Sequence, residues 1–179
     1  MLSKIDQSKA PVKTGSIYPE PYAALMAGRR SLRLGDAGGL TQFGVNIVIL
    51  APGAKSSLRH WHLHEDEFVM ILEGECALIQ DAGETLMQVG DCAAFPAGNP
   101  DGHCFVNTTA AEARFLVVGT KAPREVATYS DIDLMVTIEG KRAVFTHKDG
   151  SAYAAPAHSH PALAPTGAAD PSLKQGSDK

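Results

Sequence analysis

Residues 51–74 read APGAKSSLRHWHLHEDEFVMILEG, and the fold that the sequence predicts is built outward from this stretch. His60 and His62 are two residues apart, so on an extended strand both side chains leave the same face. Glu67 has the opposite parity, so a turn must separate it from the two histidines. The polar residues 63–66 suit that turn. Glu67 would then begin a second strand and face its carboxylate toward the two imidazoles.

Two neutral imidazoles and one carboxylate that converge on one point are a typical donor set for a divalent metal. Such nitrogen and oxygen donors favour Fe(II), Mn(II), Ni(II) or Zn(II). Three protein ligands leave coordination positions open for water or a substrate. We therefore expect one divalent transition metal per chain, with His60, His62 and Glu67 among its ligands.

A second segment, residues 90–107, supplies a candidate for the fourth ligand. It reads GDCAAFPAGNPDGHCFVN, in which the turn-rich PAGNPDG precedes His103 at the head of an apolar strand. His64 is an alternative ligand, because it shares its parity with His62. It would replace His60 if the turn lay one register later.

These two segments resemble the two sequence motifs of the cupin superfamily. The first motif appears as Gly53, His60, His62, Glu67 and Gly74. The second motif appears as Gly90, Pro96, Gly98, His103 and Asn107. Six residues rather than five precede His60, and four rather than two precede His103, but both departures lie in turns, where insertions are tolerated. The resemblance covers roughly residues 40–120. It implies a single-domain cupin whose metal ligands are His60, His62, Glu67 and His103.

Short apolar segments separated by turn signals follow one another along most of the chain. The candidate strands are residues 40–50, 58–62, 67–72, 75–80, 84–89, 92–96, 103–107 and 113–119. Many short strands with turns every 8 to 12 residues are typical of an antiparallel sandwich or barrel. The sequence therefore predicts an all-β protein. The cupin resemblance implies a double-stranded β-helix, or jelly roll, with the metal inside its mouth.

The chain divides into four predicted parts. Residues 1–39 are expected to form an N-terminal arm and loop, and residues 40–120 the barrel core. Residues 121–153 are expected to form a C-terminal extension that packs on the barrel or on a partner. Residues 154–179 are dominated by Ala, Pro, Ser and Gly, a composition that favours disorder because it buries little apolar surface. The His-Ser-His sequence in this tail has no strand to hold it as a metal site.

Composition narrows the class of partner. The formal net charge is −4 and 20% of residues are charged, which argues against a nucleic-acid surface and a polybasic membrane patch. No apolar run reaches the roughly 18 residues of a membrane span, and the polar N-terminus lacks the apolar stretch of a signal peptide. The odd number of cysteines suits a reducing compartment. We expect a cytoplasmic protein that binds a small molecule. The three cysteines are Cys76, Cys92 and Cys104.

A metal held by three imidazoles and one carboxylate suits an enzyme that acts on a small oxygenated molecule. Such a metal polarises bound oxygen atoms and lowers the pKa of bound water. Dioxygenase, isomerase, lyase and decarboxylase chemistry all stay open, and the alternative is a non-catalytic cupin that binds or senses a small ligand. No catalytic acid or base is fixed by spacing. The candidates are His64, Glu73, Tyr18 and Tyr22, with Gln42 and Asn46 as possible substrate-orienting groups.

The strand FVMIL, residues 68–72, is apolar on both faces. A strand of this kind needs a cover on each side. This pattern is consistent with the homodimer, packed sheet on sheet, that the cupin resemblance implies. The cupin resemblance also implies exchange of N-terminal arms between subunits.

Overall fold

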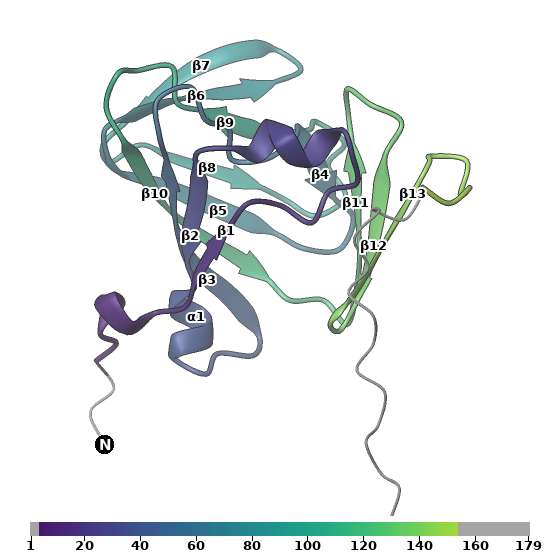
Figure 1. The fold of residues 1–179 in the computed structure, drawn as a ribbon, viewed down its shortest axis with the longest axis horizontal. Helices are drawn as coiled ribbons and strands as arrows, with labels where there is room; N and C mark the ends of the chain where they lie inside the picture. The colour runs from purple at the N-terminus through teal and green to yellow at the C-terminus, as the bar shows by residue number, and fades with distance from the viewer. Residues whose placement is uncertain (1–3, 154–179) are drawn as a thin grey trace, which may run out of the picture.

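Antiparallel strands make up nearly all of the regular structure in this computed structural model, which describes residues 4–153 (Figure 1). The short helical segments are η1 (Gln7–Lys9), η2 (Tyr22–Met26) and α1 (Leu34–Ala37). The strands are β1 (Val12–Thr14), β2 (Arg29–Leu32), β3 (Phe43–Leu50), β4 (His60–His62), β5 (Glu67–Glu73), β6 (Glu75–Gln80), β7 (Gly83–Gln88), β8 (Cys92–Phe95), β9 (Cys104–Val106), β10 (Ala113–Thr120), β11 (Arg124–Tyr129), β12 (Met135–Glu139) and β13 (Arg142–Thr146). The predicted all-β class is confirmed.

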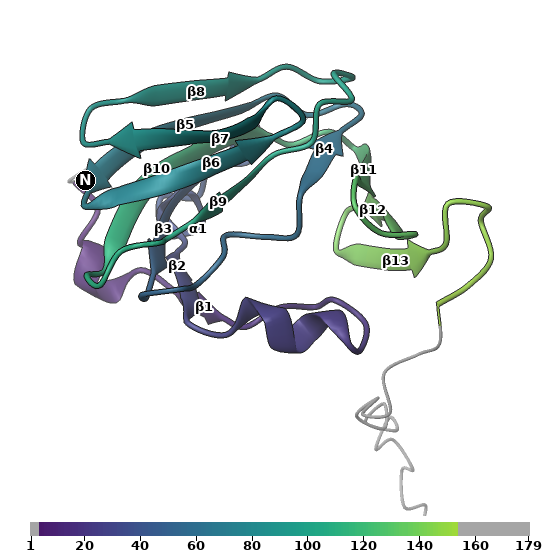
Figure 2. The ribbon, with the colours of Figure 1, turned by 90° about the horizontal axis from the view of Figure 1, so that it is seen from above.

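The strands form two facing layers. One layer is a six-stranded sheet in the order β1-β2-β3-β10-β5-β8. The other consists of a three-stranded sheet, β7-β6-β9, and a four-stranded sheet, β13-β12-β11-β4. Two isolated antiparallel bridges, Lys55 with Val106 and His60 with His103, connect these smaller sheets. Figure 2 shows β4 lying between the two groups of strands, so together they make one layer of a jelly roll.

Side-chain alternation places an apolar core between the layers. On β5, Val69 and Ile71 are fully buried, whereas Phe68 and Leu72 point away from the core and are 39% and 42% exposed. This two-residue period is what a strand with one face on the core requires. The core also contains Val48, Leu50, Leu78, Phe105 and Phe115.

The eight predicted core strands are all present, with ends that differ by a few residues. Of the other five strands, β12 and β13 lie in residues 130–140 and 142–153, whose sequences indicate further strands in the C-terminal extension, and β1, β2 and β11 were missed. Strands β1 and β2 lie within residues 1–39, the predicted arm and loop, and extend the large sheet by pairing β1 with β2 and β2 with β3. Their sequences, VKT and RRSL, are short and mostly polar, so they lack the apolar alternation that reveals a strand. The four-part division of the chain stays a prediction, and residues 154–179 lie outside the described part.

The segment between β1 and β2 packs against the C-terminal strands. Tyr18 meets Tyr129 of β11 edge to face, with ring centroids 5.3 Å apart. Tyr22 belongs to the same apolar cluster, together with Leu134 and Val136. In both views this N-terminal segment, drawn in purple, runs along the side of the barrel toward β11–β13 (Figures 1 and 2). Within the predicted arm and loop, η2 forms a short helical turn.

Phe68 and Leu72 lie on the outer face of the large sheet, which is the face that the predicted homodimer would bury. The homodimer stays a prediction. Within residues 4–153, no helix has the length and apolar character needed to cross a bilayer.

Asn107, at the end of the second motif, ties the end of β3 to the loop before β10. Its fully buried side chain donates to the carbonyl oxygens of Leu50 (2.9 Å) and Ala111 (2.7 Å) and accepts from the backbone N–H of Thr109 (3.0 Å). We expect Asn107→Ala to lower stability by about 2–4 kcal/mol, because buried groups lose their partners. Thermal unfolding should shift down by roughly 5–15 °C.

The matched control for this experiment is Asn99→Ala, at an exposed turn position. Its side chain accepts only a long bond of 3.3 Å from the Asp101 backbone N–H. The melting temperature of this variant should stay within about 2 °C of the parent. Equal melting temperatures for the two variants would contradict the anchoring role of Asn107.

Candidate metal centre

Strand β4 positions the first two candidate ligands. It pairs with β11 through His60 opposite Tyr129 and His62 opposite Ala127. The backbone N–H of His60 donates to the carbonyl oxygen of His103 (3.1 Å), and the N–H of His103 donates back to His60 (2.8 Å). The predicted turn follows at residues 63–66, and β5 begins at Glu67 as expected.

The structure brings the four side chains expected as ligands to one place. Nε2 of His60 lies 3.2 Å from Nε2 of His62, and Oε2 of Glu67 lies 4.0 Å from Nε2 of His62. Oε1 of Glu67 lies 3.3 Å from Nε2 of His103. Donor atoms that each sit about 2.0–2.2 Å from a shared ion are themselves roughly 3–4 Å apart. Each of these three separations lies in that range, and together they link the four side chains around one space.

The partners of the other ring nitrogens indicate which nitrogens carry lone pairs. Nδ1 of His60 lies 2.9 Å from the Leu58 carbonyl oxygen, which can only accept, so the proton is assigned to Nδ1. Nδ1 of His62 faces Oε1 of Glu125 at 3.5 Å, which favours a proton on Nδ1 there too, although the distance is long for a hydrogen bond. Two Nε2 lone pairs then point toward the same space. A cation between the two nitrogens would remove the repulsion between their lone pairs. These two facing lone pairs are the feature of the site that best fits a metal ion.

Electrostatics favour a neutral His60 and an ionised Glu67, whereas they favour the protonated form of His62 while no cation is bound. Burial, followed by the neighbouring His62 and His103, lowers the pKa of His60 to about 3, so its ring is neutral at pH 7. Burial opposes the charged form of His62, but Glu125 and Glu67 outweigh it and raise the pKa of His62. Burial likewise raises the pKa of Glu67, yet His103 outweighs it and the net direction is down. A neutral imidazole beside an ionised carboxylate is the state in which both bind metals.

Packing fixes the ring of His103. It stacks on Phe95, with centroids 3.6 Å apart and planes 8° from parallel, and its side chain is nearly inaccessible to solvent. Its Nδ1 is buried without a hydrogen-bond partner among the described residues. This stacking leaves Nε2 directed at Glu67.

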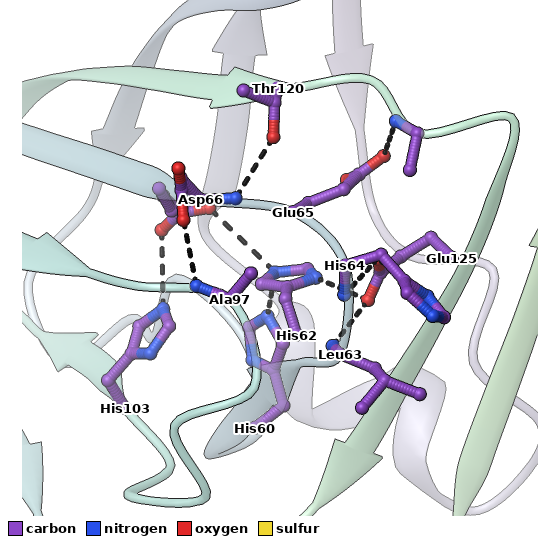
Figure 3. Close-up of polar contacts among 12 residues, drawn as sticks. His60, His62, Leu63, His64, Glu65, Asp66, Ala97, His103, Thr120 and Glu125 are labelled. Carbon is purple, nitrogen blue, oxygen red and sulfur yellow. Dashed lines mark hydrogen bonds and ion pairs between the residues drawn. The ribbon is translucent and has the colours of Figure 1, made fainter.

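Glu125 is a site residue that the sequence analysis missed. It lies on β11 and is 1% exposed, and its carboxylate accepts the backbone N–H groups of Leu63 (2.8 Å) and His64 (2.9 Å). Figure 3 shows His62 with His60 on one side and Glu125 on the other. Burial raises the pKa of Glu125, but His62 and the two backbone donors outweigh it and lower the pKa. Glu125 therefore orients His62 and shapes the turn after β4. No motif marks Glu125, because the strand that carries it is short and was not recognised.

A second group of potential ligands also contains His62. Donor atoms of His62, Glu65 and Glu125 all lie within 4.8 Å of one another, a spacing that is compatible with a metal ion. In this group, however, both oxygens of Glu125 already accept backbone N–H groups, and Oε1 of Glu65 accepts the Ala122 N–H at 2.8 Å. Hydrogen-bonded carboxylates that face the far nitrogen of a ligand histidine are typical outer partners of a metal site.

The four candidate ligands line a cavity of about 350 Å³ inside the barrel. Tyr18 and Asn46, two of the groups considered from sequence, also line it. The other candidates lie elsewhere: Gln42 is exposed, Glu73 pairs with Arg114 and Tyr22 packs on Tyr153. The side chain of His64 is 45% exposed and faces Glu125, so it does not take the place of His60 beside His62.

Comparisons with known proteins agree with this architecture. The family model for the cupin domain matches residues 46–119. A protein from Silicibacter pomeroyi, described as a sugar phosphate isomerase from a cupin superfamily, is 58% identical, with a TM-score of 0.82 over 85% of this chain and 97% of that one. None of the curated proteins matches significantly. The chain therefore belongs to the cupin superfamily, as its two motifs predicted.

Two more distant structures share the fold. One is described as a putative sugar phosphate isomerase from Acidithiobacillus ferrooxidans, 24% identical, with a TM-score of 0.64 over 71% of this chain and 81% of that one. The other is a polyketide cyclase from Streptomyces resistomycificus, also 24% identical, with a TM-score of 0.54 over 67% of this chain and 80% of that one. At this identity both show the jelly-roll fold alone.

The two ligand groups make different predictions for metal content. If the metal is held by His60, His62, Glu67 and His103, Glu67→Gln should lose most of the bound metal, because an anionic ligand becomes a neutral amide. Glu65→Gln should keep the stoichiometry of the parent. Elemental analysis of both proteins, purified without added metal, measures the difference. Metal loss in Glu65→Gln with retention in Glu67→Gln would place the ion at the second group instead.

Glu125→Gln tests the orienting role of the buried carboxylate. We expect metal affinity to fall by about 10–100-fold, the usual effect of removing an outer partner of a ligand histidine. The control is Glu139→Gln, an exposed carboxylate on the same sheet that pairs with Arg124. Competition with a coloured chelator measures both affinities. Unchanged affinity in Glu125→Gln would mean that His62 is held by β4 alone.

Proposed function

We propose that this protein is a metal-dependent enzyme that isomerises a small hydroxycarbonyl compound such as a sugar phosphate. The observation that carries the proposal is the convergence of three imidazoles and one carboxylate on one wall of an internal cavity. Its volume of about 350 Å³ is within the range of pockets that enclose small molecules. The description of the 58% identical relative as a sugar phosphate isomerase supports the choice of reaction among those that the site allows.

The proposed ligands are His60, His62, Glu67 and His103, and the ion is Fe, Mn, Ni or Zn. When bound, the metal would polarise the carbonyl or hydroxyl oxygen of the substrate as a Lewis acid. Neutral His60 and ionised Glu67 are already in the protonation states that metal binding requires. Phe95 and the surrounding barrel wall exclude water from the buried face of the site.

Hydrogen-bond donation to the substrate is assigned to Tyr18, the only group considered from sequence as an acid or base that lines the cavity. Burial raises the pKa of Tyr18, so its phenol keeps the proton at neutral pH and is suited to donate a hydrogen bond to a substrate oxygen. Tyr129 also lines the cavity, with its ring centroid 5.7 Å from that of His60. Its pKa is raised by burial and by Tyr18, so it too stays protonated.

The test is an isomerase assay on aldose and ketose phosphates in D₂O, followed by proton NMR. An isomerase that moves a proton between neighbouring carbons should convert the substrate and introduce deuterium at the reacting carbon. Glu67→Gln should lower turnover by at least about 100-fold, because a metal Lewis acid contributes several kcal/mol to the transition state. Circular dichroism should show an intact fold, and Glu139→Gln should keep parental turnover.

A metal-loaded protein that turns over none of these compounds would contradict the isomerase proposal. If such a protein still bound a small ligand without converting it, the isomerase proposal would give way to the alternative predicted from sequence. That alternative is a non-catalytic cupin that binds or senses a small ligand. The homodimeric state and the cytoplasmic location stay predictions in either case.

A further inference from the structure

A row of cationic side chains lies on the inner face of the N-terminal strands. Arg29 and Ser31 on β2, and Arg33 directly after it, alternate along the chain and therefore share one face. Lys13 of β1 pairs directly with Ser31 in the antiparallel register, which places its side chain on that same face. All four residues line the cavity that holds the candidate metal ligands.

Among the described residues, two of these cations have no anionic partner. Within residues 4–153, no ion pair or hydrogen bond is formed by the side chains of Lys13 and Arg29, and Nε of Arg29 is buried without a partner. Arg33 contacts Asp36 at 3.1 Å. By contrast, Arg30 of β2 points to the opposite face and pairs with Glu112 at 2.7 Å. The strand thus neutralises its outward arginine and leaves its inward one free.

Holding unpaired cations together in a partly enclosed place is unfavourable without a counter-charge. Burial, and then the neighbouring Arg33 and Arg29, lower the pKa of Lys13. Burial also lowers the pKa of Arg29, with Tyr18 and Glu67 acting in the opposite direction. The net charge of the chain is −4, so this positive group is not a consequence of overall composition. A built-in charge without a protein partner points to an anionic ligand.

The cationic group and the metal ligands occupy different parts of one sheet. Along the inner face of the large sheet, cations on β1 and β2 are followed by Asn46 on β3 and by Glu67 on β5. A molecule in this cavity can therefore meet positive charge at one end and the metal ligands at the other. The uncharged amide of Asn46 lies on the sheet between them.

We propose that Lys13, Arg29 and Arg33 form a subsite for the phosphate group of a phosphate monoester whose oxygenated end reaches the metal ligands. This inference rests on the proposed function for the reacting end of the molecule and adds the residues that would bind its phosphate group. A phosphate monoester fits better than a carboxylate, because it carries close to two negative charges at pH 7 and three acceptor oxygens. Arginine presents a planar fork that binds such oxygens in pairs, and the Ser31 hydroxyl supplies a further donor.

Inorganic phosphate is the probe, and its binding to the full chain is measured by titration calorimetry at constant ionic strength. Arg29→Gln should weaken phosphate binding by about tenfold or more, because a charge-assisted contact is lost. Arg30→Gln, a change on the neighbouring residue that faces outward, should bind as the parent does. Lys13→Gln should also weaken binding, which keeps the test decisive if Arg29→Gln fails to fold.

The subsite and the metal centre are tested separately. Glu67→Gln should lose metal and turnover yet keep phosphate binding, whereas Arg29→Gln should keep the metal content of the parent. Phosphate binding that disappears in Glu67→Gln or after chelation would mean that phosphate binds at the metal, which overturns the subsite. Equal binding by Arg29→Gln, Lys13→Gln and the parent would also overturn it. Acetate that binds as tightly as phosphate would overturn the choice of a phosphate monoester.

Discussion

The pair of backbone hydrogen bonds between His60 and His103 is the contact on which the arrangement of the site depends. Each residue donates its N–H to the carbonyl oxygen of the other, at 3.1 Å and 2.8 Å, where the four-stranded and three-stranded sheets meet. Because backbone bonds set the separation of two strands to a narrow range, this bridge holds two distant segments in a fixed register. The pairing of β5 with β8, in which Glu67 lies opposite Phe95, joins the two motifs a second time within the large sheet.

Three local features orient the four candidate ligands. Strand parity sends His60 and His62 to one side, and the turn bound by Glu125 reverses the chain so that Glu67 faces them. An aromatic stack on Phe95 directs the fourth, His103. These features act on groups that are already partly buried, so little rotamer freedom remains to be lost when a ligand binds. The site is therefore largely preorganised by the backbone and the core.

The sequence correctly predicted the strands and turns that are encoded by residues close together in the chain. The spacing of His60, His62 and Glu67 predicted a strand, a turn and a second strand, and this order is found. Glu125 was out of reach, because its importance comes from contacts with residues about sixty positions earlier in the chain. No periodicity within its own strand encodes such a contact. The metal-ligating role of the four side chains and the predicted domain boundaries stay predictions.

The polar strands β1 and β2 escaped detection for a related reason. Their inward side chains are Lys13, Arg29 and Ser31, so the face that is apolar in most strands is cationic here. A reading that equates the inner face with apolar residues treats such segments as loops. The cationic side chains that made these strands hard to recognise also give one wall of the cavity its positive charge.

The cationic wall belongs to a part of the chain that carries no candidate metal ligand. Residues 12–33 join the sheet edge through β1 and β2, whereas the four candidate ligands all lie between residues 60 and 103. Within one barrel, the proposed recognition of phosphate and the proposed chemistry at the metal are therefore carried by separate segments of the chain. A graft of this edge from a related barrel would exchange the charge preference of the cavity while the metal-facing strands retained their geometry.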